Sequence, residues 1–382
     1  MQVRKVEIFD VRISAGWNPV VVRVHTDEGV SGVGEVALAY GAGSPAAVGM
    51  LRELAERFII GADPFAVEKL WDAMYRGTFW GQGGGPVLYG AMSAVDEALW
   101  DIRGRALGVP VWQLLGGPCH ESLRVYANGW YHGLNEPEKY AERALEVQRD
   151  GYGATKFDPF AVRPDGVEAA PGRALERERE DVAVARVAAV REAVGPEFDI
   201  LIEVHGNLGT ASAIRAGRRL EAFEPFFYEE PVDAMNVKSM RKVSRNVHIP
   251  IAAGERLYTR YGFRPYIEEQ VLDVLQPDLG LAGGITEVKK IAAAAETYNL
   301  HVQPHNCAGP VATAAAVHLD AAVPNFIIQE LFPYRGSDTL NVVEEPLEER
   351  IEDGSLPLPE EPGLGVELND DYLERFACVT VP

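Results

Sequence analysis

Six titratable residues recur through the second half of the chain, each directly after a short apolar run. They follow one another at intervals of 23 to 27 residues and are Glu203, Glu229, Glu255, Asp278, His305 and Glu330. A polar residue is common where a chain leaves the core, which would account for one or two of these positions. Six such residues at nearly equal intervals instead indicate repeated units, each of which brings one residue to a shared site.

Three of these residues are carboxylates on consecutive units, namely Glu203, Glu229 and Glu255. An all-oxygen set of this kind suits Mg²⁺, which takes a few protein carboxylates and keeps positions open for water or substrate. Without a cation, three clustered carboxylates would repel one another and their pKa values would rise. We therefore expect a magnesium site with these three ligands.

Two histidines are candidates for proton transfer. His305 lies in QPHN, one unit after Asp278 in QPDLG, so that the Asp278 carboxylate can hold one ring nitrogen and make the other a general base. His205 lies two residues after Glu203. Because side chains alternate along a strand, we expect His205 and Glu203 to share one face and point at the same site.

The segment TKFDPF adds Lys156 and Asp158, which share a strand face by the same alternation. A lysine beside a metal site can bind an anionic group or carry a proton, and its alternative role is a salt bridge to a metal-binding carboxylate. We expect Asp158 to contribute to substrate binding.

The elements that carry these residues alternate between short apolar runs and amphipathic segments of helical length. From about residue 124 this pair repeats about seven times, the pattern of a parallel (β/α) barrel. A doubly wound open sheet is the competing arrangement, but no GxGxxG follows an early strand. A barrel brings the C-terminal ends of all its strands to one mouth, so the six residues would converge there.

The remaining segments flank this repeat. Residues 1–120 combine β-branched runs with two helical stretches and predict an α+β domain, followed by the barrel over 121–340. The tail, 341–382, returns to short strands and turns, and we expect it to pack on the N-terminal domain. Residues 161–180 are rich in proline, glycine and charge, and predict a long loop after a strand.

Composition excludes several classes of protein. The 57 acidic and 36 basic residues give a formal charge of −21, which disfavours nucleic acid and anionic membranes as partners. No run of about 20 apolar residues predicts a membrane span, and the N-terminus lacks an apolar signal segment. The three cysteines are far apart and predict neither a disulfide framework nor a zinc site. We expect a cytoplasmic protein.

Several motifs together resemble the enolase superfamily. They are ExH, EEP, GER, QPDLG, GGITE, PHN and QE in that order, the SAVDEALWDIRGRALGVPVWQLLGG helix and the PGLG turn. The resemblance spans essentially the whole chain and is closest to the mandelate racemase subgroup, within it to galactonate-dehydratase-like acid-sugar dehydratases. It implies an α/β fold, a modified (β/α)7β TIM-type barrel capped by an α+β domain built from the N-terminal segment and the C-terminal tail.

The resemblance also implies roles. It makes Glu203, Glu229 and Glu255 the Mg²⁺ ligands, His305 with Asp278 the base, and Glu330 the acid that hydrogen-bonds a substrate carboxylate oxygen. His205 occupies the position of the histidine acid, and Lys156 matches the first lysine of the family's KxK strand. Two departures stand out: Glu203 replaces the usual Asp, and Asp158 replaces the second lysine, which counts against a two-base racemase.

These roles predict a Mg²⁺-dependent dehydratase acting on a sugar acid such as galactonate, gluconate, xylonate or arabinonate. Removal of the C2 proton would give an enediolate, and loss of water would yield a 2-keto-3-deoxy acid. By position, Trp17 and Tyr40 resemble the family's two specificity loops, although Trp17 equally suits the core of the cap. The resemblance suggests a homo-oligomer. The alternatives are an epimerase or cycloisomerase of a sugar acid or its lactone, or a non-catalytic binding barrel.

Overall fold

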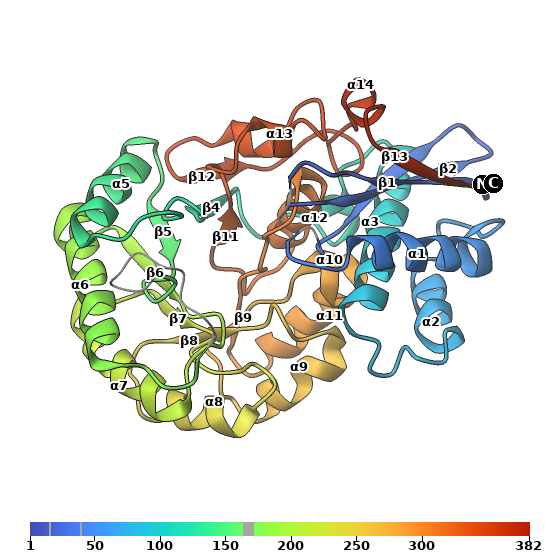
Figure 1. Ribbon diagram of the computed structural model, residues 1–382. Coiled ribbons are helices and arrows are strands. Elements are labelled where there is room, and N and C mark those ends of the chain that lie inside the picture. Colours follow the sequence, from blue (N-terminus) through green and yellow to red (C-terminus); the bar gives the residue numbers. More distant parts are fainter. Residues whose placement is uncertain (15–16, 39, 163–171) are drawn as a thin grey trace.

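The computed structural model describes residues 1–14, 17–38, 40–162 and 172–382, and Figure 1 shows it as a barrel joined to a smaller lobe. Both ends of the chain lie together in the smaller lobe, beside strands β1 and β13 (Figure 1). We refer to the smaller lobe as the cap.

The cap consists of an antiparallel sheet and helices packed on it. The sheet has the order β13-β1-β2-β3, and its strands are β1 (Val3–Asp10), β2 (Val20–Thr26), β3 (Ser31–Val36) and β13 (Ala377–Val381). The main helices are α1 (Ser44–Leu54), α2 (Val67–Gly77) and α3 (Gly85–Leu107). Valines of β2 and the apolar stripe of α3 form the cap's core. Helix α3 ends at Gly108, whose φ of 69° is in the left-handed region that favours glycine.

Strands alternate with helices to form the barrel, and Figure 1 shows the helices around the strands. Within the described ranges the barrel has eight parallel strands and seven outer helices. The strands are β4 (Ser122–Ala127), β5 (Ala154–Phe157), β6 (Asp199–Glu203), β7 (Phe227–Glu229), β8 (Ile251–Ala253), β9 (Val274–Leu275), β10 (His301–Val302) and β11 (Gln329–Leu331). The outer helices are α5 (Pro137–Arg149), α6 (Arg177–Val194), α7 (Thr210–Leu220), α8 (Val237–Ser244), α9 (Thr259–Glu268), α11 (Gly284–Glu296) and α12 (Pro310–Ala321).

The strands are paired in the order β10-β9-β8-β7-β6-β5-β4-β11. A single bridge between Val302 and Phe326 joins β10 to the segment before β11. The (β/α)7β barrel with an α+β cap, predicted from the sequence, is thereby confirmed. The competing open sheet is wrong, because β11 pairs with the first barrel strand, β4, and the Val302–Phe326 bridge closes the circle on the other side.

Short elements complete the chain. They are α4 (Val111–Leu114), α10 (Leu279–Ala282), α13 (Ser337–Leu340), α14 (Asp370–Leu373) and β12 (Ser355–Pro357). The tail contacts both lobes, since β12 pairs with β4 of the barrel and β13 pairs with β1 of the cap. In the expected loop 161–180, helix α6 already begins at Arg177, and residues 163–171 lie outside the described part. No helix in the described residues is long and apolar enough to cross a membrane.

Alternation along the barrel strands places a layer of apolar side chains inside the barrel. This layer is a separate small core made of Tyr126, Ala154, Leu201, Phe227, Ala252, Val274 and Ile328. Two residues further along, the same strand faces carry Lys156, Glu203, Glu229 and Glu330. The apolar layer therefore forms the floor of a polar site at the C-terminal ends of the strands, as in other barrels of this kind.

Candidate active site

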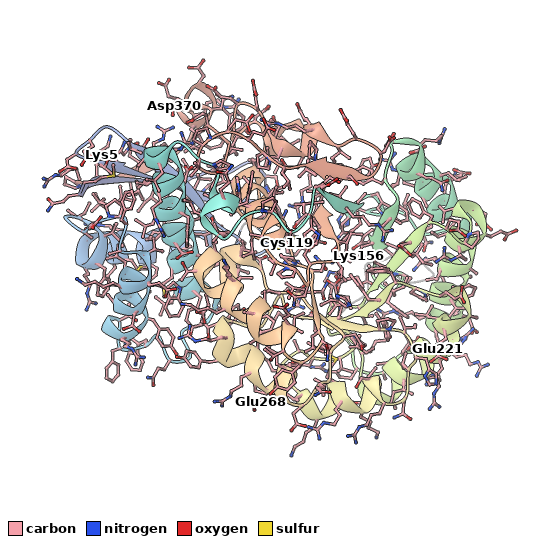
Figure 2. The ribbon with its side chains drawn as sticks, turned by 180° about the vertical axis from the view of Figure 1, so that it is seen from behind. Lys5, Cys119, Lys156, Glu221, Glu268 and Asp370 are labelled. Atoms are coloured by element: carbon pink, nitrogen blue, oxygen red, sulfur yellow. The ribbon has the colours of Figure 1, made fainter. Side chains whose placement is uncertain are left out.

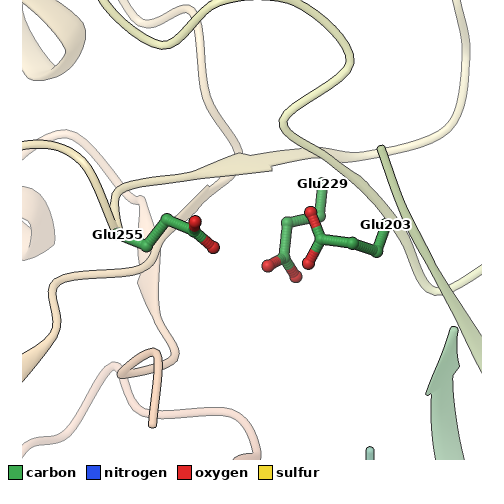
Figure 3. A group of neighbouring side chains, drawn as sticks. All are labelled: Glu203, Glu229 and Glu255. Atoms are coloured by element: carbon green, nitrogen blue, oxygen red, sulfur yellow. The ribbon is translucent and has the colours of Figure 1, made fainter. Parts of the chain in front are cut away.

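The three glutamates expected to bind a metal lie together at the mouth of the barrel (Figure 3). Glu203 and Glu229 end β6 and β7 and are paired across the sheet, and Glu255 follows two residues after β8. One carboxylate oxygen of each lies within 4.8 Å of the others. The donor set is entirely carboxylate, so its chemistry fits a hard divalent cation such as Mg²⁺.

Lys156 lies inside the barrel, where Figure 2 labels it, with its side chain completely buried. Its ammonium contacts three carboxylates: Glu229 at 2.6 Å, Glu330 at 2.9 Å and Glu203 at 3.3 Å. Burial alone would lower the pKa of Lys156, but these carboxylates raise it well above its usual value. Lys156 is therefore a fixed positive charge, and it forms the salt bridge to metal-binding carboxylates that was one of its two expected roles.

The neighbouring glutamates Glu203 and Glu229 differ in ionisation. Burial and the charge of Glu203 raise the pKa of Glu229 well above its usual value. Burial also opposes ionisation of Glu203, but the charges of His205 and Lys156 lower the pKa of Glu203 below its usual value. Added positive charge between the two carboxylates would relieve their repulsion, which is a second way in which this site fits a cation.

His305 and Asp278 form the expected pair. The His305 Nδ1 lies 2.8 Å from the Asp278 carboxylate, and its Nε2 lies 3.4 Å from Glu255 and 4.0 Å from Glu330. Although burial alone would lower the pKa of His305, Glu255, Glu330 and the bond to Asp278 raise it well above its usual value. The Nε2 of His305 therefore faces the glutamates, the position expected for a nitrogen that transfers a proton at this site.

His205 and Asp158 form a second pair of the same kind. The His205 Nδ1 lies 2.9 Å from Asp158, and its Nε2 lies 4.0 Å from Glu203. Burial alone would lower the pKa of His205, but Glu203 and the bond to Asp158 raise it to about 10. The Asp158 carboxylate also accepts a hydrogen bond from the backbone N–H of Phe160 at 2.7 Å. Asp158, expected to contribute to substrate binding, therefore already holds His205.

Strand alternation, however, is not what places these two residues. Strand β6 ends at Glu203, and His205 follows it with a φ of 54°, in the left-handed region. Strand β5 likewise ends at Phe157, one residue before Asp158. The turns after the two strands bring the side chains of His205 and Asp158 together. The prediction that side-chain alternation along a strand positions them was therefore wrong.

Glu330 links the two sides of the site. One of its oxygens lies 2.9 Å from the Lys156 ammonium and accepts a 2.8 Å hydrogen bond from the side chain of Asn128. The other accepts a hydrogen bond from the backbone N–H of Asn306, next to His305, at 2.9 Å. Burial opposes its ionisation, but Lys156 and His305 keep its pKa below the usual value. Glu330 is thus an ionised residue that positions both Lys156 and the His305 loop.

The two residues expected in the specificity loops lie in different environments. The backbones of Trp17 and Tyr40 form a bridge, so the two loops touch. Trp17 is only 7% exposed, and the Arg335 guanidinium stacks over its ring at 3.4 Å, whereas Tyr40 is 71% exposed. Trp17 is therefore buried against Arg335, which follows strand β11, and Tyr40 is exposed at the surface.

Sequence reasoning missed four residues of this site. Asn128 follows β4 and lies 28 residues before Lys156, so the rule of one residue per strand end identifies it. Gln276 and Gln303 follow β9 and β10, and Gln276 donates to both Glu229 and Gln303 at 2.7 Å. The rule does not single out these glutamines, because Asp278 and His305 already represent the same two strand ends. Arg335, which also donates to the Cys307 carbonyl, carries no such signal, because it lies in the irregular segment after β11.

The sequence matches two family models in chain order. The model described as "Mandelate racemase / muconate lactonizing enzyme, N-terminal domain" matches residues 14–116, and "Enolase C-terminal domain-like" matches residues 139–372. The chain belongs to the enolase superfamily. A solved enolase-superfamily member from Salmonella Typhimurium is 42% identical, with a TM-score of 0.96 over 100% of both chains.

Curated relatives in the enolase superfamily carry dehydratase names. D-galactonate dehydratase of Xanthomonas campestris pv. campestris (strain B100) is 38% identical over 359 residues, which are 93% of this chain and 90% of that protein. D-gluconate dehydratase of Thermoproteus tenax is 34% identical over 383 residues, 98% of this chain and 73% of that protein. Members of the superfamily typically bind a divalent metal, and Glu203, Glu229 and Glu255 form a group that can hold one.

Proposed function

We propose that this protein is a Mg²⁺-dependent dehydratase that removes water from a sugar acid. The observation that carries the proposal is the pair of Asp–His arrangements at the metal site. His305 approaches Glu255 and His205 approaches Glu203, each with Nδ1 held by an aspartate and Nε2 directed at the glutamates. Two separately oriented imidazoles can remove one proton and supply another, which dehydration requires.

Glu203, Glu229 and Glu255 would hold the Mg²⁺. A cation bound there supplies positive charge next to the substrate carboxylate and so stabilises negative charge that develops on it. Lys156 adds a second positive charge, fixed by its contacts with Glu229 and Glu330. Such preorganised charge is commonly the largest single contribution to catalysis.

The proton transfers follow from the two histidines. His305 takes the C2 proton at Nε2, and Asp278 stabilises the imidazolium that forms. The electron pair of the broken C–H bond passes into an enediolate and then forms the C2–C3 double bond. The C3 hydroxyl departs as water with a proton from Nε2 of His205, whose orientation Asp158 fixes. The enol product takes a solvent proton at C3 to become a 2-keto-3-deoxy acid.

The position of Asp158 argues against racemisation by two bases. A racemase needs a second base on the opposite face of the substrate. The residue that could supply it after strand β5 is Asp158, whose carboxylate is bound by His205 and by the Phe160 N–H. The names of the curated relatives support an aldonate as the substrate, with galactonate and gluconate as the first candidates.

A His205→Asn substitution should separate the two proton transfers. Dehydration is expected to fall by about 10²- to 10⁴-fold, the usual contribution of a general acid. Exchange of the substrate C2 proton with D₂O should continue, because His305 and Asp278 are untouched. Proton NMR of the substrate measures the exchange. Parallel loss of exchange and dehydration would contradict the assignment of His205 as the acid.

The proposed function is tested by incubating the protein and Mg²⁺ with a library of aldonates and aldarates. We expect one or a few of these acids to give a 2-keto-3-deoxy product, detected with semicarbazide. An enzyme with bound metal that converts none of them would refute an acid-sugar dehydratase.

A further inference from the structure

The end of cap strand β3 contacts both loops that carry the His305–Asp278 pair. The Ala37 backbone N–H donates to the carbonyl of Gly280, two residues after Asp278, at 3.1 Å. One oxygen of Glu35 accepts a hydrogen bond from the Gly309 N–H at 2.6 Å, and the other from the Ala312 N–H at 3.1 Å. The buried Glu35 carboxylate therefore caps helix α12, directly after the His305 loop.

Both loops approach the cap closely at a glycine. A Cβ on Gly280 would lie 2.7 Å from the Cβ of Ala37, and a Cβ on Gly309 would lie 2.7 Å from the Glu35 carboxylate. Gly309 has an ordinary φ of −94°, so the requirement there is for space rather than for an unusual backbone conformation. These contacts leave little freedom for movement between β3 and the two loops.

Strand β3 is in turn fixed to helix α3. The backbone N–H of Glu35 donates to the carboxylate of Glu97 at 2.9 Å, and that of Val33 donates to Asp101 at 2.9 Å. Glycines at 32 and 34 bring the strand directly against the helix, since a Cβ would lie 2.3 Å and 1.9 Å from the carbonyls of Ala98 and Ala94, respectively. The side chain of Glu35 thus extends from a rigid part of the cap.

We propose that Glu35 is a positioning residue for the His305–Asp278 pair. It holds the 305–309 loop from the cap side, while Glu330 holds the same loop from inside the barrel through the Asn306 N–H. The cap then sets the geometry of the base in addition to covering the site. This inference rests on the proposed function only for the role of His305 as the base.

The protonation of Glu35 supports this interpretation. Burial raises the pKa of Glu35 to about 7, because the N–H groups of Ala312 and Gly309 compensate only partly for lost hydration. A buried carboxylate with a raised pKa is less favourable for stability at neutral pH than a neutral residue of the same shape. A neutral glutamine could accept only one of the two N–H groups, so the carboxylate is what holds both Gly309 and Ala312, next to the His305 loop.

A Glu35→Gln substitution tests the proposal. The glutamine retains the shape but offers one acceptor oxygen, so its NH₂ group faces the Gly309 or the Ala312 N–H. We expect kcat to fall by about 10- to 100-fold with KM nearly unchanged, since small misplacements of a catalytic group have effects of this size. The melting temperature should stay within a few degrees of the parent protein. Glu180→Gln, which changes another buried carboxylate but lies in α6, where it pairs with Arg215 and Arg219 and not with either loop, should retain the parental kcat.

A second variant covers the case in which Glu35→Gln fails to fold. Gly309→Ala leaves Glu35 in place but pushes its carboxylate away, and should lower kcat in the same way. Gly49→Ala is its matched control, because Gly49 lies in α1 of the cap with open space around its Cβ position. We expect Gly49→Ala to retain full activity.

The ring resonances of His305, in protein labelled with ¹⁵N-histidine, give a measurement that needs no turnover. They are assigned by their loss in His305→Asn. The proposal predicts that they shift in Glu35→Gln and Gly309→Ala but not in Glu180→Gln. Unchanged resonances with parental kcat, or an equal loss of kcat in Glu180→Gln, would overturn it. A parent enzyme that converts no sugar acid would refute the proposed function, while the resonance shifts would still decide the role of Glu35.

Discussion

A His305→Asn enzyme should lose dehydration of its sugar acid by about 10²- to 10⁴-fold and lose exchange of the substrate C2 proton as well. Asparagine has nearly the same size but cannot accept a proton from carbon. Both reactions depend on this one step, so both should fall together. They are measured by product formation and by proton NMR in D₂O.

The chain offers a matched control for this substitution. His301 lies four residues earlier, at the exposed start of β10, and has no contact with the glutamates among its described interactions. His301→Asn should keep the parental kcat. Continued C2 exchange in folded His305→Asn would show that another group removes the proton and would contradict the assignment of the base.

Glu229→Gln should abolish activity and weaken Mg²⁺ binding. The loss of affinity should exceed the roughly 10- to 100-fold that is typical when a residue that only supports a metal ligand is lost. The substitution removes one of the three proposed carboxylate ligands and also one of the ion pairs that fix Lys156. Calorimetric titration with Mg²⁺ measures the affinity, and unfolding curves verify that the variant is folded.

The neighbouring glutamate provides the comparison. Glu230 follows Glu229 in the sequence, but its carboxylate is paired with Arg256 rather than directed at the other two ligands. Glu230→Gln should weaken Mg²⁺ binding by no more than about 10- to 100-fold, because Glu230 reaches the candidate ligands only through Arg256, which also pairs with Glu255. Equal losses of affinity in the two variants would contradict the choice of Glu229 as the ligand.

Removal of the metal should have the same consequence without any substitution. Exhaustive dialysis against EDTA is expected to abolish dehydration, and added Mg²⁺ should restore it. Zn²⁺ should restore it less well, because the site consists of carboxylates rather than histidine or cysteine. Full activity after EDTA treatment would contradict a metal-dependent reaction.

The sequence predicted those parts of the site that depend on regular strands. Glu203, Glu229, Lys156 and Glu330 lie on strand positions that face into the barrel, so the repeat of about 26 residues and the alternation of side chains were sufficient to bring them together. Asn128 follows the same rule and could have been identified from it.

For site residues on turns, the sequence predicted that they belong to the site but not which side chains they contact. His205 and Asp158 meet because the chain after β6 adopts a left-handed conformation at His205, which no repeat in the sequence specifies. Their contact makes Asp158 a partner of a histidine, and its contribution to substrate binding stays a prediction. Loop geometry depends on the packing of the whole barrel mouth, which local patterns do not encode.

Buried acids of the cap were missed for a different reason. In helix α3, Glu97 and Asp101 read as an ordinary charged face of an amphipathic helix, yet both are fully buried and accept backbone hydrogen bonds from β3. A carboxylate looks the same in a sequence whether it faces water or the N–H groups of a distant segment. The role inferred for Glu35 depends on such a non-local contact.

Product analysis in D₂O is the most direct test of the central claim, that the two histidines of this metal site carry out a dehydration. The account predicts a 2-keto-3-deoxy acid with one solvent deuterium at C3, seen by ¹H and ¹³C NMR. A sugar acid that instead acquires deuterium at C2 and keeps its C3 hydroxyl would show that the enediolate is only reprotonated, and would contradict the dehydratase mechanism.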